Sequence, residues 1–174
     1  MEKKFELTDK FVFNTFGIKL FQIKCTKSFK YAKEGDLGGY VEKDENLDQE
    51  SDAWVSGDAQ VYGDARVYDD AQVCGDAWVC GNARVYGNAQ VYGDADIEND
   101  NNHCGFDCFG SCNRHTHAYL TKDNKVEITC GCFRGSIEEF EKKVEKTHSG
   151  KIYEKQYKAI INVIKIKFGL TDLI

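Results

Sequence analysis

A six-residue repeat in the middle of the chain constrains the fold more than any other feature of the sequence. From Val55 to Ile97 an aliphatic residue recurs at every sixth position, and alanine keeps the same spacing two positions earlier, from Ala53 to Ala95. Each hexad also carries Gly, Asp or Asn followed by Asp or Asn, residues that suit sharp corners because they tolerate positive φ. Eight hexads keep all three positions without a gap, so the repeat predicts one regular structure.

The spacing of the repeat predicts a triangular coil. Ala-x-Val is a three-residue strand whose two ends point inward, because side chains alternate along a strand. Three such strands and three corners close one coil of 18 residues, and coils stack at about 4.8 Å. Hexapeptide coils of this kind resemble the left-handed β-helix family, an exception to the right-handed crossover rule. The left-handedness is implied by that resemblance.

Residues 18 positions apart are predicted to share one flat outward face. One face carries Arg66 above Arg84 and Tyr68 above Tyr86. Rows of exposed aromatic side chains are unusual on a monomer. Hexapeptide β-helices commonly associate through such faces, so we expect a homotrimer. The other two faces carry Trp54, Gln72 and Gln90 with Ser56, Cys74 and Tyr92, and Gln60, Trp78 and Asp96 with Tyr62, Cys80 and Glu98.

The segments on either side of the repeat have a different rhythm. Residues 1–46 predict a β N-terminal cap, because an open solenoid end exposes unpaired backbone. Residues 47–100 form the β-helix, and residues 101–174 predict a small ββαα domain with strands around Lys122–Asn124, a helix beginning at Ser136 and a second helix over about 153–168. The predicted fold class is therefore mainly β: a short left-handed parallel β-helix with a β N-terminal cap and a small α/β C-terminal domain.

Composition excludes some classes of function. The formal net charge of −6 argues against general nucleic-acid binding, which normally shows a basic footprint. There is neither a secretory signal nor an apolar run of about 18 residues, so we expect no membrane contact and a cytoplasmic location. The 8 cysteines are then expected to be reduced thiols or metal ligands rather than disulfides.

Three groups of motifs together resemble a known family. They are Gly35–Gly39 followed by Glu42 and Asn46-Leu47, the hexads, and Cys130-Gly131-Cys132-Phe133-x-Gly135 followed by Glu139-Phe140, Val144 and His148. This combination resembles hexapeptide-repeat proteins of phage and prophage genomes of Firmicutes, often called only polymer-forming or hypothetical. The likeness covers nearly the whole chain; the thiols Cys104, Cys108 and Cys112 depart from it. It implies a bacterial host cytoplasm as the setting.

The candidate ligand-binding residues are Arg66, Arg84, Tyr68, Tyr86 and Trp78. Arginine forks suit phosphates, and aromatic rings suit stacked bases. In a trimer the Arg66–Arg84 face could line clefts between subunits. The alternative is that this face is the trimer interface itself, since interfaces also favour Tyr, Trp and Arg.

Metal binding and catalysis have weaker signals. Zinc would use thiols and imidazoles, yet their spacing does not match the paired motifs of zinc sites. Stacked corner carboxylates could hold calcium, but Asp is common in such turns for its backbone conformation. Acyl transfer needs a placed histidine base, and no histidine lies between Asp52 and Asn102. We therefore expect no metal, no cofactor and no enzyme. The residues weighed are Cys104, Cys108, Cys112, His115, His117, Cys130 and Cys132 for zinc, and Asp58, Asp76 and Asp94 for calcium.

These features favour a non-enzymatic phage or prophage binding protein. The sharpest version is a counter-defence protein that sequesters a small anionic or nucleotide signal in clefts between subunits. The alternative is a structural or assembly protein, or an inhibitor that binds a host protein through its C-terminal domain. An acyltransferase-like enzyme comes third.

Overall fold

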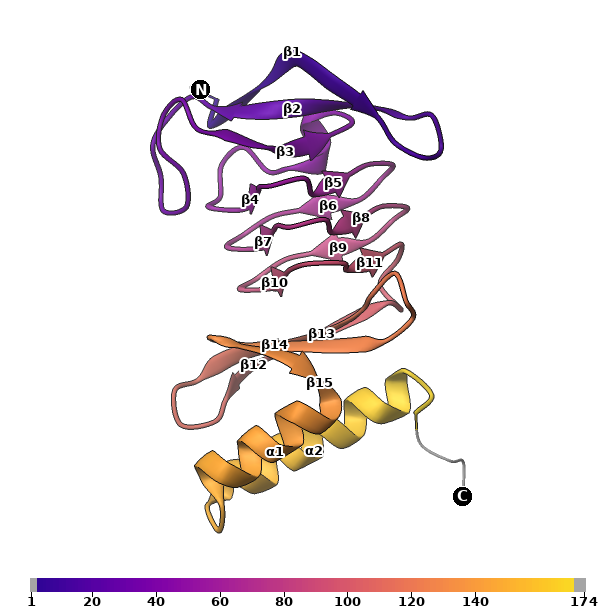
Figure 1. Cartoon of the computed structure of the whole chain (residues 1–174). Coiled ribbons are helices and arrows are strands. Elements are labelled where there is room, and N and C mark those ends of the chain that lie inside the picture. Colours follow the sequence, from indigo (N-terminus) through magenta and orange to yellow (C-terminus); the bar gives the residue numbers. More distant parts are fainter. Residues whose placement is uncertain (1–2, 171–174) are drawn as a thin grey trace. The chain divides into compact units, whose positions relative to one another are not determined.

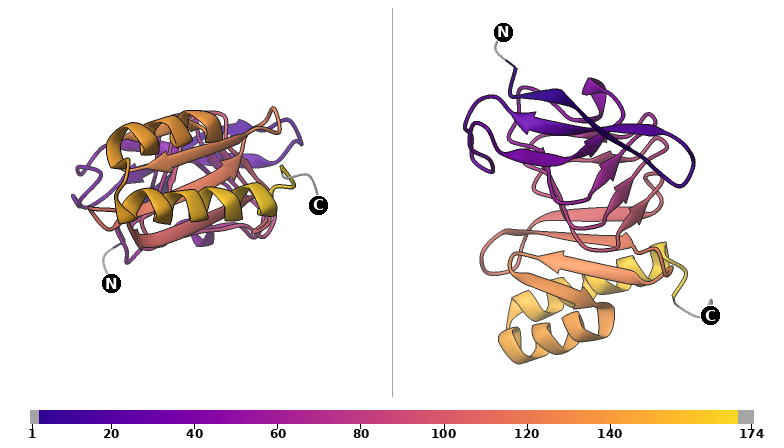
Figure 2. Two further views of the ribbon diagram at one scale, coloured as in Figure 1. Left: turned by 90° about the horizontal axis from the view of Figure 1, so that it is seen from below. Right: turned by 45° about the horizontal axis from the view of Figure 1, so that its top comes forward.

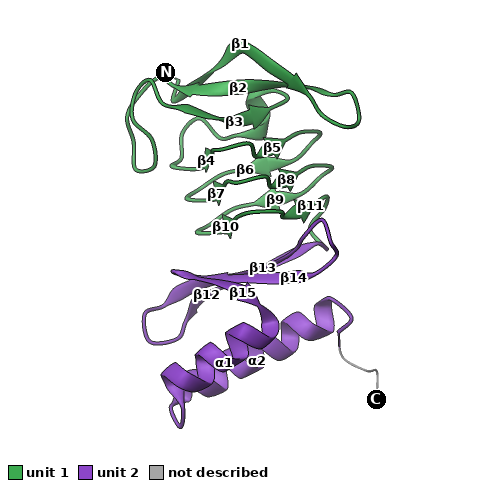
Figure 3. Ribbon diagram, viewed as in Figure 1, with its two compact units in different colours: residues 1–100 green, residues 101–174 purple. Residues whose placement is uncertain are grey.

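The computed structural model describes residues 3–170, and the chain forms two compact units, Met1–Asp100 and Asn101–Ile174 (Figure 3). The first unit consists of a β-solenoid and its N-terminal cap, and the second of a four-stranded sheet with two helices. The predicted fold class, mainly β with a short solenoid and a small α/β C-terminal part, is confirmed.

The solenoid consists of two-residue strands that stack in parallel (Figure 1). Arg66 pairs with Arg84, Trp54 with Gln72, and Gln60 with Trp78. These partners are 18 residues apart, as predicted. The strands are β4 Trp54–Val55, β5 Gln60–Val61, β6 Arg66–Val67, β7 Gln72–Val73, β8 Trp78–Val79, β9 Arg84–Val85, β10 Gln90–Val91 and β11 Asp96–Ile97.

The repeated alanine and aliphatic residues form the interior of the solenoid. Every one of them from Ala53 to Ile97 is buried, with at most 2% of its surface exposed. The corners from Gly57 to Gly93 turn through positive φ at the first residue of the turn pair, for example Gly57 at 68° and Asp69 at 58°, whereas Asn99 in the last hexad does not. Each position of the hexad therefore has the structural role that the repeat predicted.

The cap closes the first coil by extending its sheets and satisfying its backbone groups. It comprises β1 Phe5–Phe13, β2 Lys19–Cys25, β3 Leu37–Val41 and a 3-10 helix at Asp44–Asn46. Strand β3 pairs in parallel with β5. The buried Asn46 amide donates to the carbonyl oxygens of Gly63 and Ala65 at 3.1 and 2.9 Å. Without such partners these backbone groups would be left unpaired.

The cap also covers outward side chains that we predicted to be exposed. Tyr62 and Cys80 are buried against Leu20 and Tyr40. Trp54 lies edge-on to Phe29, with ring centroids 5.4 Å apart, and is only 5% exposed. The expectation of exposed aromatic rows is thus wrong for these residues, because the chain's own N-terminal segments fold over them.

The second unit is an antiparallel sheet of order β12-β13-β14-β15, and both helices lie on the same face of it (Figure 2). The predicted strand pair corresponds to β13 and β14, and the structure adds an outer strand on each side. The elements are β12 His103–Phe109, β13 Arg114–Leu120, β14 Val126–Cys130, β15 Phe133–Ser136, α1 Ile137–His148 and α2 Ile152–Lys167.

Local signals set the helix ends as predicted. The hydroxyl of Ser136 accepts from the backbone N–H of Glu139, whose carboxylate accepts from the N–H of Ser136, which is a complete capping box. At the end of α2, Gly169 has φ of 66°. The N–H groups of Gly169 and Leu170 donate to Ile166 and Lys165, which closes a Schellman motif.

The inner helix faces pack on one side of the sheet as a single core. Its centre consists of Ala118, Ile128, Cys130, Ile137, Phe140, Val144, Tyr157, Ile160, Ile161 and Ile164. Among residues 3–170, no helix is both long enough and apolar enough to cross a membrane.

Candidate ligand-binding site

Four predicted site residues form a ladder on the outer surface of strands β6 and β9. Arg66 lies directly beside Arg84 in the parallel register, and both side chains are exposed. Just beyond the strands, the rings of Tyr68 and Tyr86 stack with centroids 5.3 Å apart and planes 13° from parallel. We call Arg66, Arg84, Tyr68 and Tyr86 the arginine–tyrosine ladder. The 18-residue period brings them together, as the sequence predicted.

The ladder borders an open groove of about 860 Å³. Arg66, Arg84 and Tyr68 line it on the solenoid side. The rest of its wall comes mainly from the segment that joins the cap to the first coil. Five carboxylates therefore face the same groove as the two guanidinium groups: Asp44, Glu45, Asp48, Glu50 and Asp64.

Sequence reasoning missed this acidic wall. Its signal was the acidic run over residues 44–50, which directly precedes the first coil. The 3-10 helix at Asp44–Asn46 and the bridge of Leu47 to Val67 fix that run beside β6.

Most of the acidic wall already has partners. Asp44 forms an ion pair with Lys3 at 2.6 Å, and Asp64 forms one with Lys43 at 3.2 Å. Partial burial opposes ionisation of Asp48, but hydrogen bonds from Ser51 and Glu50 hold the pKa of Asp48 below its ordinary value. The groove is thus a mixed surface in which the carboxylates are largely occupied.

The two arginines differ from the carboxylates in this respect. Within residues 3–170, neither guanidinium forms an ion pair or a hydrogen bond. Like charges placed directly opposite on neighbouring strands are destabilising. An anion between them would relieve that repulsion, and an arginine fork can hold a phosphate or carboxylate through two hydrogen bonds.

The tyrosines give the ladder an aromatic end. Tyr68 is half-buried and Tyr86 is 53% exposed. Burial, and then the neighbouring Tyr86, raise the pKa of Tyr68, so its hydroxyl stays protonated and can donate a hydrogen bond. A flat ring could stack on the outer face of Tyr86, as bases stack on aromatic side chains.

Trp78 is not part of this arrangement. It lies on β8 between Gln60 and Asp96, in the sheet that contains β5 and β11, whereas the ladder lies on β6 and β9. The structure therefore brings together four of the five predicted residues within one chain. Trp78 could join the ladder only from another copy of the protein.

The candidate metal ligands do not gather into one site, although the ring centroids of His115 and His117 lie 5.7 Å apart. Among the described residues, no three His, Cys, Asp or Glu side chains are placed to hold a metal ion. Cys130 belongs to the core of the second unit and Cys104 packs against it. Burial raises the pKa of Cys104 to about 11, so this thiol packs as a small apolar group. The corner residues Asp58, Asp76 and Asp94 are exposed.

The fold and the periodic faces define a β-solenoid repeat protein. Comparison with known families agrees at this level: a family model described as YdcK Beta solenoid repeat matches residues 59–75 and 77–93. Both matched segments lie inside the solenoid, and they start 18 residues apart, one coil after the other. No curated protein matched the chain.

Proposed function

We propose that the protein is a non-enzymatic binding protein that holds a small anionic or nucleotide ligand on the arginine–tyrosine ladder. The observation that carries the proposal is the pair of exposed, unpartnered guanidinium groups side by side on β6 and β9. The stacked tyrosines beside them would hold an aromatic base. Glu45 and Glu50, the two wall carboxylates without a hydrogen-bond or ion-pair partner among residues 3–170, would accept hydrogen bonds from the amino groups of that base. The negative charge of the wall would disfavour larger polyanions.

Binding without catalysis is supported by where the histidines lie. All four, His103, His115, His117 and His148, belong to the second unit. The groove in the first unit is lined by carboxylates, arginines and a tyrosine, without a histidine base among its lining residues. Acyl transfer on a hexapeptide solenoid would require such a base.

The proposed setting is the cytoplasm of a bacterial host that carries the gene on a phage or prophage. The protein would act as a homotrimer, with the ladder of each subunit in a cleft against the next. Trp78 of a neighbouring subunit would complete the aromatic side of that cleft. Sequestering a nucleotide immune signal there would make the protein a counter-defence factor.

The first test is native mass spectrometry of the full chain, purified gently from phage-challenged cells. We expect a homotrimer that carries about one small anionic ligand per subunit. The variant Arg66→Ala plus Arg84→Ala should lose that ligand while remaining a folded trimer. Lys10→Ala plus Lys24→Ala removes the same charge from the cap and should retain the ligand. An unchanged ligand content in the arginine variant would contradict the site.

A second candidate function is protein docking through the second unit. The outer face of α2 exposes Ile152, Val163 and Ile166, and Val163 and Ile166, three residues apart, are neighbours on that face. Apolar patches of this kind mark interaction sites, which fits an inhibitor or assembly protein that binds a host protein. If so, Val163→Ser plus Ile166→Ser should abolish capture of the partner and leave ligand retention on the ladder unchanged.

A further inference from the structure

The second unit contains a cationic pocket that the proposed function does not use. It has a volume of about 250 Å³ and lies between the turn joining β14 to β15 and the two helices. None of its lining residues is a carboxylate, although the whole chain has a net charge of −6. The lining residues are Arg114, Cys130, Cys132, Phe133, Arg134, Phe140, Lys143, Val144, Thr147, His148 and Tyr157.

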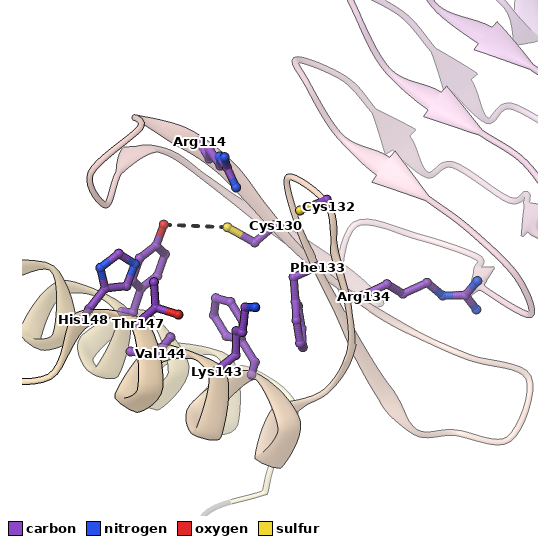
Figure 4. Close-up of a pocket in the computed structure, with 11 residues that line it drawn as sticks. Arg114, Cys130, Cys132, Phe133, Arg134, Lys143, Val144, Thr147 and His148 are labelled. Carbon is purple, nitrogen blue, oxygen red and sulfur yellow. Dashed lines mark hydrogen bonds between the residues drawn. The ribbon is translucent and has the colours of Figure 1, made fainter.

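Two cationic side chains approach the pocket from opposite sides. Arg114 comes from β13, and Lys143 points from α1 toward the turn that carries Cys132 (Figure 4). Neither side chain forms an ion pair or a hydrogen bond with any residue from 3 to 170. Arg134 differs from both, because it extends away from the pocket and its Nε donates to Glu127 at 2.7 Å.

The Arg114 side chain lies close to the backbone of the turn between β14 and β15. Gly131 has φ of 59°, and a Cβ built on it would lie 2.7 Å from an Arg114 guanidinium nitrogen. Glycine at this turn therefore serves two purposes: it adopts the left-handed conformation and leaves room for the guanidinium above it. A side chain at position 131 would displace Arg114 from the pocket.

Aromatic rings form the other walls of the pocket. The rings of Phe133 and Phe140 have centroids 5.0 Å apart, and His148 stacks on Tyr157 at 5.5 Å with planes 27° from parallel. The hydroxyl of Tyr157 contacts the Cys130 sulfur at 3.7 Å. Burial raises the pKa of Tyr157, so this hydroxyl stays protonated beside the cations.

We propose that this pocket binds a small organic anion with an aromatic body. Its carboxylate or phosphate group would lie between Arg114 and Lys143, and its ring would pack against Phe133 and Phe140. Pockets for drug-sized ligands span about 300–1,000 Å³, so this smaller one suits a single-ring molecule better than a nucleotide. The site is independent of the arginine–tyrosine ladder.

The test is an NMR titration of the full chain with benzoate, phenyl phosphate and the neutral analogue benzamide. We expect at least one of the two anions to shift the resonances of Arg114 and His148, and benzamide to leave them unchanged. Arg114→Gln or Lys143→Gln should weaken binding at least about tenfold, since a hydrogen bond to a charged group contributes about 1.5–3 kcal/mol. Arg134→Gln is the matched control and should bind like the wild type.

A second readout covers the case in which a variant fails to fold. In the wild-type protein, a bound anion should slow alkylation of Cys132, which lies at the pocket, and leave the rate at exposed Cys108 unchanged. The proposal is overturned if neither anion binds, if benzamide binds as well as the anions, or if inorganic phosphate binds as tightly as phenyl phosphate. Equal weakening by Arg134→Gln and Arg114→Gln would also overturn it.

Discussion

At the scale of single residues, the buried ammonium of Lys4 makes the stability of the cap depend on pH. Lys4 is 6% exposed and donates to the carbonyl oxygens of Ser51 and Ala53 at 2.6 and 2.8 Å. Burial lowers the pKa of Lys4 from 10.5 to about 8. Below the lower value the folded state carries the full cost of the buried charge. Between the two values the unfolded chain binds more protons, so the free energy of unfolding rises with pH.

We therefore expect wild-type protein to gain stability relative to Lys4→Met between pH 7 and pH 10. The gain should be roughly 1–2 kcal/mol, less than the full shift implies, because water still reaches part of the group. Urea unfolding at several pH values measures it. Tyr62 and Cys80, whose pKa values burial raises, oppose the trend in both proteins and cancel in the difference. Lys24→Met, at an exposed site, is the control. If the difference in free energy of unfolding between the wild type and Lys4→Met does not change with pH, deprotonation of Lys4 relieves no buried charge.

At the scale of elements, two corner glycines allow the cost of backbone strain to be distinguished from the cost of a steric clash between stacked coils. Gly81 and Gly87 have nearly the same φ, 59° and 62°. A Cβ on Gly81 would collide with the carbonyl oxygen of Glu98 in the following turn of chain, whereas a Cβ on Gly87 would meet nothing within 4 Å. Alanine at either corner adopts a strained conformation, which costs about 1–2 kcal/mol.

Gly81→Ala should accordingly destabilise the protein by roughly 2 kcal/mol more than Gly87→Ala, because it adds a steric clash to the shared strain. The midpoints and slopes of urea unfolding curves give both values. Asp69 occupies the equivalent corner one coil before Gly87. It already has φ of 58°, and its carboxylate accepts from the N–H of Gly87 at 3.1 Å, so this row of corners tolerates a side chain. Equal losses at the two corners would mean that the coils can shift apart at little cost.

How far the elements could be predicted depends on how local their determinants are. Each hexad predicts its own local structure, because a small inward residue, an aliphatic inward residue and a corner pair fit only this coil. The capping box at Ser136 and the stop at Gly169 are equally local. Strand β12 was missed although Cys104 and Phe106 alternate with Gly105 and Asp107, because Gly and Asp are uncommon in strands and its pairing depends on β13.

Part of the candidate site could likewise be predicted from local sequence, and part could not. The ladder follows from the period of 18 residues, so Arg66 and Arg84 could be paired from sequence. The acidic wall could not, because only the folded cap brings Asp48 and its neighbours beside β6. The pocket around Arg114 could not be predicted from the sequence either, since its walls come from β13, a turn and two helices that are distant in sequence.

At the scale of the whole molecule, the open question is which surface joins copies of the chain. Two surfaces compete. One is the arginine–tyrosine ladder, and the other is an aromatic patch on the β1–β2 hairpin, where Phe13 and Phe16 are 64% and 70% exposed. Two adjacent, unpaired arginines would be costly to bury in an interface unless the partner supplied carboxylates to them, whereas exposed aromatic side chains gain from burial.

We predict that the hairpin patch contributes to the trimer and that the ladder remains open as a cleft. Sedimentation equilibrium should give a mass near three times the 19.7 kDa of one chain. Phe13→Ser plus Phe16→Ser should shift the protein toward monomer, since both rings would lose apolar burial. Arg66→Ala plus Arg84→Ala should leave the protein trimeric. If the arginine variant dissociates and the phenylalanine variant does not, the ladder is the interface itself, and a ligand cleft on that face is excluded.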